Sequence, residues 1–320
     1  MWIVPESAIA DLLDEASAFA AIETCFAAMA RQDAYNFPVV REALGAGRQY
    51  GFKSGLDRVN AILGVKAGGY FPGNAETGIP NHQSTVCLFD PESGKPKALV
   101  GGNLLTALRT AAASAISIKY LARPDAKVLG MVGAGHQSLF QLRAAVGQRP
   151  FERVVGWNLH PEMLPRLAEE AATLGLPFQS VSLEELGAQA DVIITITSSF
   201  DAILKTSHIR AGTHLACMGT DTKGKQEVEA TLLSHATVFT DEIAQSVSIG
   251  EAQHAIEAKL IAQTDITEIG RVITGEHAGR TSDAEITIFD GTGVGLQDLA
   301  VAARAVSLAI ESGVAQEVAF

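Results

Sequence analysis

The sequence predicts an α/β fold in two parts, a Rossmann-like doubly wound parallel sheet and a second, discontinuous α+β domain. Three observations support this prediction. From residue 127 onward, uninterrupted apolar runs alternate with helical segments, which is typical of strands buried on both faces of a parallel sheet. The first run, KVLGMVG, leads directly into the glycine-containing loop GAGHQS at 133–138. The length of 320 residues allows two domains, each with its own core.

The first third of the chain indicates the mixed α+β domain. Residues 14–31 are rich in alanine, with apolar residues at helical spacing, and predict a helix. Residues 103–122 predict a long helix with Asn103 as its N-cap, and it ends before Pro124 because a residue preceding proline is pushed out of the helical region. Between these helices lie four predicted strands, RQYGF, NAILGVKAG, STVCLFD and PKALVG, the last two joined by a hairpin turn at Pro91, Gly94 and Lys95.

The remaining chain predicts the parallel sheet and a return to the first domain. Helical segments follow the first two strands, and a final helix is expected at 296–312. We therefore expect residues 1–123 and 297–320 to form the α+β domain and residues 124–296 the dinucleotide-binding domain. The active site would lie in the cleft between domains, a common place for ligand pockets. The predicted strands are KVLGMVG, RVVGWN, DVIITIT, THLACMG, ATVFTD and the start of ITIFDGTGVG.

Composition excludes several classes of function. The formal net charge of −12 argues against a nucleic-acid partner, because such proteins carry a basic face. It does not exclude a small anionic substrate, since a few cations can dominate one cleft. Cys25, Cys87 and Cys217 have no metal-binding spacing, so we expect reduced thiols and no metal site. Neither a signal peptide nor a run of about 20 apolar residues occurs, so we expect a cytoplasmic protein with no membrane partner.

The loop at 133–138 has the features of a dinucleotide-binding loop with one departure. Gly133 allows a tight turn after the strand, and Gly135 allows the backbone to approach a pyrophosphate at a helix N-terminus. Ser138 stands where the third glycine of such loops occurs. The next strand ends at Asn158, and Glu162 nearby would repel a 2′-phosphate, so NAD(H) is favoured over NADP(H). The alternative is a tight strand–helix turn with no nucleotide.

Longer motifs carry a family resemblance. The segment GIPNHQSTVCLFDPESGKPKALVGGNLLTALRTAAASA, followed by GAGHQS and GTDTKGKQEVE, resembles the ornithine cyclodeaminase/mu-crystallin family over residues 36–306. The resemblance implies a discontinuous substrate-binding and dimerisation domain, a Rossmann domain, NAD(H) or NADP(H), and a homodimer. It also implies chemistry at the carbon–nitrogen bond of α-amino acids.

The resemblance assigns site residues position by position. Arg41, Lys66 and Arg109 match residues around the substrate carboxylate, although Arg48 competes with Arg41 for this role. Asp221 matches the acid that exchanges a proton with the substrate nitrogen, and Lys66 is placed with it in the catalytic set. The resemblance, together with the glycine loop, implies cofactor contacts from Arg109, Thr110, Gly133, Ala134, Gly135, His136, Gln137, Asn158, Thr197, Ser198, Met218, Gly219, Gly293 and Val294, with Asp298 in the loop near the nicotinamide.

The chemistry of imine reduction suits these residue types. Hydride adds readily to C=N only when the nitrogen is protonated, and a carboxylic acid such as Asp221 can supply that proton. The planar fork of an arginine matches the two oxygens of a carboxylate and fixes the reacting carbon. Each residue also has a structural alternative: an exposed helix arginine for Arg109, a turn for Asp221, and a structural hydrogen bond in place of a substrate contact for His82.

The segment YGFKSG suggests the substrate. Many family members carry a Met-Pro pair near the substrate side chain, where this chain has Lys53 and Ser54. A lysine facing the pocket requires an anion, which favours a dicarboxylic imine and the reduction of iminosuccinate to L-aspartate. If Lys53 faces solvent instead, Arg58 is the alternative partner. The rival functions are an ornithine- or lysine-type cyclodeaminase, a ketimine reductase or alanine-type dehydrogenase, and a non-catalytic nucleotide-binding protein.

Overall fold

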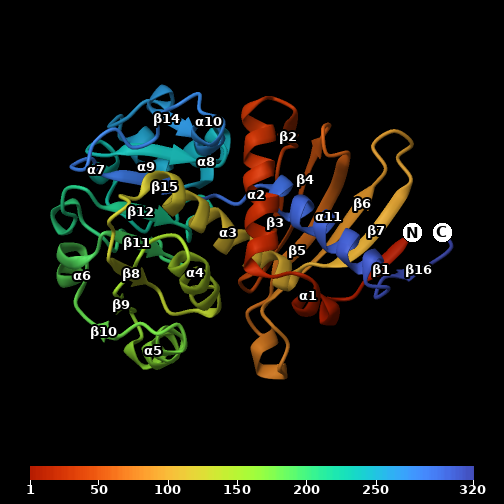
Figure 1. Ribbon diagram of the computed structural model, residues 1–320, viewed down its shortest axis with the longest axis horizontal. Coiled ribbons are helices and arrows are strands. Elements are labelled where there is room, and N and C mark those ends of the chain that lie inside the picture. Colours follow the sequence, from red (N-terminus) through yellow and green to blue (C-terminus); the bar gives the residue numbers. More distant parts are fainter. The chain divides into compact units, whose positions relative to one another are not determined.

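The computed structural model describes residues 1–320, with the side chain of residue 75 left aside. The chain divides into two compact units, Met1–Arg109 with Val294–Phe320 (unit 1) and Thr110–Gly293 (unit 2). The boundary lies inside the helix α3 (Asn103–Leu121), whereas the expected boundary was at its end. Figure 1 gives the labels of the elements in both units. No helix among the described residues is long and apolar enough to cross a membrane.

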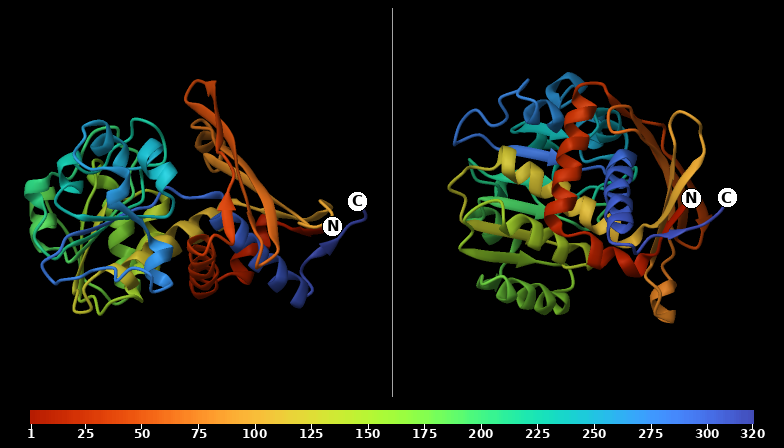
Figure 2. Two further views of the ribbon diagram at one scale, coloured as in Figure 1. Left: turned by 90° about the horizontal axis from the view of Figure 1, so that it is seen from above. Right: turned by 45° about the vertical axis from the view of Figure 1, so that its right-hand side comes forward.

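The described residues of unit 1 form an eight-stranded sheet in which the order is β16-β1-β7-β6-β5-β4-β2 and β3 pairs with β4. Its long central strands are antiparallel neighbours. The two chain ends meet at one edge, where β1 pairs with β16 (Figure 2). The strands are β1 (Trp2–Val4), β2 (Ala34–Asn36), β3 (Val40–Gly45), β4 (Arg48–Asp57), β5 (Ile62–Tyr70), β6 (His82–Phe89), β7 (Pro96–Gly101) and β16 (Gln316–Glu317).

Two helices pack on one face of this sheet. Helix α2 (Glu15–Ala30) starts at Asp14, whose side chain accepts a hydrogen bond from the Ser17 N–H, and it packs against α11 (Gly295–Glu311). Helix α11 contacts β4, β5 and β6 through its apolar side, which is why its small and aliphatic residues are buried. Unit 1 also contains α1 (Glu6–Leu12) and the short 3₁₀ helix η1 (Asn74–Thr77).

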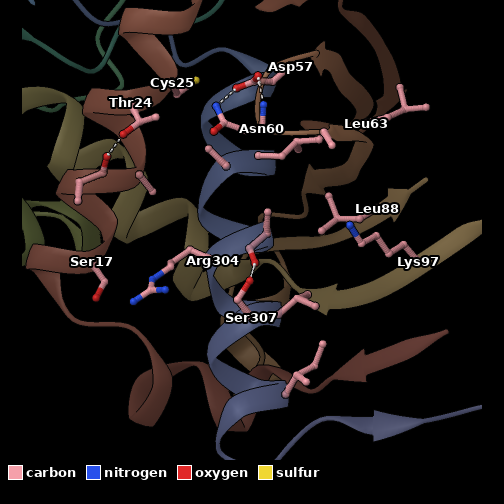
Figure 3. A pocket seen from close by; sticks show the side chains of 18 of the residues that line it. Ser17, Thr24, Cys25, Asp57, Asn60, Leu63, Leu88, Lys97, Arg304 and Ser307 are labelled. Carbon is pink, nitrogen blue, oxygen red and sulfur yellow. Dashed lines mark hydrogen bonds between the residues drawn. The ribbon is translucent and has the colours of Figure 1, made fainter. Parts of the chain in front are cut away.

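A cavity of about 690 Å³ lies beside α2 and α11 in unit 1 (Figure 3). Alanines of both helices and residues of β5 and β6 line much of it, with polar side chains such as Arg304 and Lys97 at its walls. Its lining residues include none of the predicted substrate-binding side chains. This cavity is therefore separate from the predicted substrate-binding side chains.

The start of α3 differs from the prediction that Asn103 is its N-cap. Asn103 is the first helical residue, and its side chain accepts a hydrogen bond from the Ser84 N–H. The carboxylate of Glu6 accepts instead from the N–H groups of Asn103 and Leu104, at 3.0 and 2.7 Å. Glu6 provides a stronger acceptor than an amide, because a carboxylate also interacts favourably with the helix dipole.

The described residues of unit 2 form an eight-stranded, all-parallel sheet in the order β10-β9-β8-β11-β12-β15-β13-β14. This confirms the predicted Rossmann-like sheet. The strand order reverses between β8 and β11, the point at which such sheets bind ligands. The strands are β8 (Val128–Val132), β9 (Arg153–Trp157), β10 (Phe178–Ser180), β11 (Val192–Thr195), β12 (His214–Cys217), β13 (Thr237–Thr240), β14 (Ile266–Glu268) and β15 (Thr287–Asp290).

Helices alternate with these strands, as the sequence pattern predicts. Helix α4 (His136–Val146) follows β8, and α5 (Leu164–Thr173) follows β9. Helix α6 (Leu183–Gln189) begins with a capping box between Ser182 and Glu185. The other elements are α7 (Ala230–Leu233), α8 (Ile243–Ile249), α9 (Ala252–Glu257), α10 (Ile269–Ile273), η2 (Pro161–Met163), η3 (Thr206–His208) and η4 (Gln263–Asp265).

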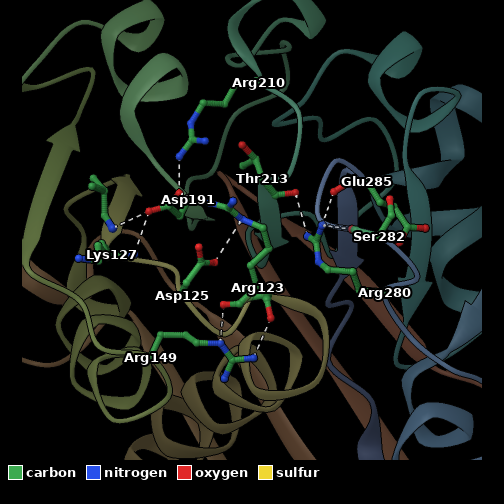
Figure 4. A network of polar contacts seen from close by, with 12 residues as sticks. Arg123, Asp125, Lys127, Arg149, Asp191, Arg210, Thr213, Arg280, Ser282 and Glu285 are labelled. Atoms are coloured by element: carbon green, nitrogen blue, oxygen red, sulfur yellow. Dashed lines mark hydrogen bonds and ion pairs between the residues drawn. The ribbon is translucent and has the colours of Figure 1, made fainter.

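A polar network fixes the end of α3 within unit 2 (Figure 4). Arg149 donates to the carbonyl groups of Lys119, in the last turn of α3, and of Ala122 and Arg123, directly after its end. Asp191 accepts from Arg123 at 2.6 Å and from the N–H groups at the start of β8. The network therefore sets where α3 stops and β8 begins.

Candidate active site

A buried charged cluster occupies unit 1, centred on Asp298 in the first turn of α11. Oδ1 of Asp298 accepts hydrogen bonds from Lys66 Nζ at 3.0 Å and Arg109 Nε at 3.1 Å. Lys66 also donates to Thr106 Oγ1 at 2.7 Å, and Arg109 to Gln297 Oε1 at 3.1 Å. Lys66 and Arg109 are each 7% exposed and Asp298 is fully buried. The structure thus brings together two of the predicted substrate-binding cations, around a carboxylate that had been predicted only as part of a loop near the nicotinamide.

The charges of this cluster depend on one another. Burial by itself would raise the pKa of Asp298, but the positive charges of Lys66, Arg109 and Lys53 outweigh it and hold that pKa at about 2. Burial lowers the pKa of His82 to about 4, and the charge of Lys66 adds to the shift. At neutral pH the cluster therefore contains an ionised Asp298 and a neutral His82.

Strand register places Lys53 on the same side of the sheet as Lys66. The two lysines are directly paired between β4 and β5, and paired residues of antiparallel strands point to the same face. Gly55 and Gly64, two residues further along these strands, approach Leu296 and Leu299 of α11, which identifies the face. Lys53 is only partly exposed. It therefore belongs to the charged cluster, as the electrostatic effect of Lys53 on Asp298 also indicates.

Arg41 and His82 lie on the same face. Arg41 pairs with Gly51, which is two residues from Lys53 on β4. His82 precedes Val86 by four residues on β6, and Val86 pairs with Lys66. Between Arg41 and Ser84, the paired residues of β4 and β5 are Gly51 and Gly68, so these two positions carry no side chain of their own on this face. A Cβ on Gly68 would meet Ser84 at 2.6 Å, so the close strands require glycine at this position.

The glycine loop of unit 2 has the geometry expected for binding a pyrophosphate. Gly133 has a φ of +110°, and a Cβ there would meet the Ile196 carbonyl oxygen at 2.6 Å. Gly135 precedes α4, which has no side-chain cap, and a Cβ on Gly135 would meet nothing within 4 Å. The N-terminus of α4 thus combines open space with unsatisfied N–H groups, a combination that favours an anion.

Asn158 supports this loop from the end of β9. Its Oδ1 accepts from the Ala134 N–H at 3.1 Å, and its Nδ2 donates to the His160 carbonyl at 2.8 Å. These bonds hold the amide next to the loop, and the predicted ribose contact stays a prediction. The adjacent positions His136 and Gln137 form the first turn of α4.

The remaining predicted residues of unit 2 follow the carboxyl ends of its strands. Thr197 and Ser198 follow β11, Met218 and Gly219 follow β12, and Gly293 follows β15. Carboxyl ends of parallel strands lie at one edge of a sheet, where ligands bind. Buried carboxylates of Glu227 and Asp241 accept hydrogen bonds from the N–H groups of Thr197, Gly219 and Gly293 in these segments. Thr110, also predicted, is a buried residue of α3 directly after Arg109, and Val294 is the residue before α11.

Asp221, the predicted proton donor, lies in the loop after β12. Its Oδ1 is 2.8 Å from Lys225 Nζ, and this lysine also donates to the Gly219 carbonyl. The Asp221 side chain is 39% exposed, so the carboxyl group is accessible. Sequence reasoning missed Lys225, although a lysine four residues after an aspartate is a recognisable signal for an ion pair.

Comparisons with known proteins agree with these features. The profile of the ornithine cyclodeaminase/mu-crystallin family matches residues 39–313. The iminosuccinate reductase of Paracoccus denitrificans (strain Pd 1222) is 62% identical over 319 residues, which is 99% of both chains.

Two solved structures resemble the fold closely. The structure of the iminosuccinate reductase of Paracoccus denitrificans in complex with NAD+ matches with a TM-score of 0.97 and 62% identity, covering 100% of this chain and 99% of that one. An archaeal alanine dehydrogenase dimer with bound NAD matches with a TM-score of 0.95 and 30% identity, again covering 100% and 99% of the chains.

Proposed function

Because the chain belongs to the ornithine cyclodeaminase/mu-crystallin family, we propose that it is an NAD-dependent oxidoreductase that reduces iminosuccinate to L-aspartate. The observation that carries this proposal is the direct pairing of Lys53 with Lys66. Like charges at directly paired positions of a sheet repel each other, and burial increases the cost. Two such lysines beside Arg109 favour a substrate with more than one negative charge.

The charges of the cluster match a dicarboxylate. Lys53, Lys66 and Arg109 contribute three positive charges and Asp298 one negative charge, and Arg41 on the same face adds a further positive charge, while His82 is neutral. A dicarboxylic imine compensates two of these positive charges, whereas a monocarboxylic imine compensates only one. Ornithine or lysine would add a distal cation next to Lys53, which disfavours cyclodeamination.

The chain's own residues have distinct roles in this proposal. Arg109, with Arg41 and Lys66, holds the α-carboxylate, and Lys53 holds the distal carboxylate. Such positioning fixes the imine carbon and lowers the barrier to hydride transfer by on the order of 10 kcal/mol. Asp221 delivers a proton to the imine nitrogen, which makes the carbon a better electrophile. NADH, when bound, supplies the hydride.

NAD fits the residues of unit 2. The open space at Gly135 and the uncapped N-terminus of α4 suit the pyrophosphate, and the tight turn at Gly133 brings the backbone close to it. A few residues after β9 the chain carries the exposed Glu162, whose negative charge would repel a 2′-phosphate. These features favour NAD(H) over NADP(H).

A coupled assay tests the proposal. Oxaloacetate and excess ammonia generate iminosuccinate, and reduction is followed as the loss of NADH absorbance. We expect rapid oxidation of NADH with this mixture and slow oxidation with pyruvate and methylamine, which form a monocarboxylic imine. The opposite preference would contradict the dicarboxylate assignment. The absence of oxidation with both mixtures, despite NADH binding, would favour a non-catalytic nucleotide-binding protein.

We also propose that the protein is a homodimer. On the face of the unit 1 sheet opposite Lys66, the side chains of Val40, Tyr50, Phe52 and Leu99 are 36–46% exposed. A cluster of exposed large apolar side chains is typical of an interaction surface. Sedimentation equilibrium should give twice the chain mass of 33.6 kDa, and Phe52→Glu should shift it to the monomer.

A cytoplasmic location is our proposal as well, since no disulfide joins the three cysteines.

A further inference from the structure

Unit 2 contains four buried acids next to the carboxyl ends of its strands: Glu227, Glu251, Asp290 and Asp241, each no more than 2% exposed. Glu227, Glu251 and Asp290 have no ion pair with a lysine or arginine among the described residues. No group of three or more acidic, histidine or cysteine side chains in the described part of the chain is arranged to hold a metal ion. The hydrogen-bond partners of Glu227, Glu251 and Asp290 are instead backbone N–H groups and hydroxyl groups.

Glu227 joins two strand ends. Its Oε1 accepts from the N–H and the hydroxyl group of Thr197, at 2.6 and 2.8 Å. Its Oε2 accepts from the hydroxyl group of Thr195 at 2.6 Å and from the N–H of Gly219 at 2.8 Å. Thr195 ends β11 and Gly219 follows β12, so one carboxylate ties together the segments after two neighbouring parallel strands.

The backbone of Glu227 is itself held in place. The carboxyl group of Glu251 accepts from the N–H groups of Glu227 and Val228, at 2.9 and 2.8 Å. A Cβ on Gly219 would meet Glu227 Oε1 at 2.5 Å, so Gly219 allows the carboxylate to approach. Glu227 therefore closes the loop 219–227, which contains Asp221.

The geometry requires a carboxylate rather than an amide. Each oxygen of Glu227 accepts one backbone N–H group, and a backbone N–H cannot rotate to become an acceptor. A glutamine would place its NH₂ group against one of the two N–H groups whichever way its amide is turned. The substitution would release either the segment at Thr197 or the segment at Gly219.

We propose that Glu227 is a positioning residue that sets the affinity for NAD(H) by holding the segments at Thr197 and Gly219 in one arrangement. This inference rests on the proposed function, because both segments are proposed to contact the cofactor. Glu227 does not contact the cofactor itself in this proposal, since its carboxylate oxygens are occupied by the two segments.

Calorimetric titration with NADH tests the proposal with a matched pair of variants. Glu227→Gln should raise the Kd for NADH about tenfold or more, because hydrogen bonds to a charged group are lost from a cofactor-binding segment. Glu229→Gln is the control: Glu229 is two residues away and accepts from the Thr206 N–H at 2.8 Å, outside these segments. The control should keep the Kd of the wild type within about twofold.

The outcomes separate this inference from the proposed function. If the wild type does not bind NADH, the proposed function fails. If the wild type binds NADH and Glu227→Gln has the same Kd, the inference is overturned. This also holds if the variant contains less folded protein but its folded fraction binds NADH with the Kd of the wild type. If Glu227→Gln does not fold, Glu227→Asp takes its place, because it keeps the charge but is one methylene shorter, so its carboxylate cannot reach the N–H groups of both Thr197 and Gly219. It should raise the Kd severalfold, and an unchanged Kd would overturn the inference.

Discussion

Replacing Asp298 with asparagine should destabilise unit 1 by an amount that depends on pH. Asparagine keeps the size of the side chain and removes the charge that pairs with Lys66 and Arg109. The pKa of Asp298 is about 2, compared with an ordinary 3.8, so its charged form is favoured by roughly 2 kcal/mol at one pKa unit per 1.36 kcal/mol. Removing one partner of a buried ion pair costs about 3–5 kcal/mol. We therefore expect Asp298→Asn to lower the free energy of unfolding at pH 7 by about 2–5 kcal/mol.

The pH dependence follows from the direction of the shift. Because the folded pKa lies below the unfolded pKa, this contribution is present above about pH 4 and is lost as the pH falls toward 2. Asp298→Asn has no such group to protonate. The difference in unfolding free energy between the wild type and the variant should therefore shrink by about 2 kcal/mol between pH 5 and pH 2.5.

Urea unfolding can report on unit 1 alone. The chain has two tryptophans, Trp2 in unit 1 and Trp157 in unit 2, so a Trp157→Phe background leaves Trp2 fluorescence as the probe. Asp11→Asn is the control, because Asp11 is an exposed aspartate of α1 and should change stability by no more than about 0.5 kcal/mol. A loss below about 1 kcal/mol at pH 7, or the same loss at both pH values, would refute the reasoning.

Three further predictions concern the substrate, the proton and the buried acids. Lys53→Met should raise the KM for iminosuccinate roughly 5- to 150-fold in steady-state assays, which corresponds to about 1–3 kcal/mol of lost binding free energy. The control Lys95→Met, in an exposed turn, should leave the KM unchanged. Equal KM values for Lys53→Met and the wild type would place Lys53 outside the substrate site. Asp221→Asn should lower kcat about 100-fold while calorimetry gives an unchanged Kd for NADH; near-normal kcat would remove Asp221 from the mechanism. Burial and the neighbouring Glu227 raise the pKa of Glu251 from 4.5 to about 8, so its contribution to stability is complete below pH 4.5 and is lost as the pH rises to 8. Melting temperatures of the wild type should therefore fall over this range more than those of Glu251→Gln, and parallel pH profiles would contradict the shift.

The fold could be predicted from local patterns because most of its elements are long and strongly periodic. The apolar runs of unit 2 became parallel strands, and residues 14–31 and 103–122 became helices within a residue or two of the predicted ends. The short strands β1 and β16, the last two at one side of the unit 1 sheet, were not predicted. They are two or three residues long, and their pairing joins the two ends of the chain, which no local pattern encodes.

The sequence could nominate candidate site residues one by one, but it could not predict how they pair. Lys66 in an apolar strand signals that a buried partner is needed, yet the partner, Asp298, is 232 residues away. Glu6, which accepts hydrogen bonds at the start of α3, is 97 residues away from Asn103. Glu227 lies in the polar segment GKQEVEA, where local composition suggests exposure. Burial there depends on which strands are neighbours, and that information lies in the fold rather than the segment.

The acidic composition and the cationic cluster are compatible because the buried acids belong to unit 2 and the clustered cations to unit 1. Two acids of unit 2, Glu251 and Asp290, have pKa values raised by burial to about 8 and 7, so both are largely or partly protonated at neutral pH. The formal charge of −12 counts both as ionised and therefore overstates the negative charge of the folded protein. In unit 1 the positive charges surround a single buried carboxylate in a low-dielectric environment, where each charge acts more strongly than on the surface. A dianion responds to that local field, so net charge alone is a poor guide to which ligands this chain binds.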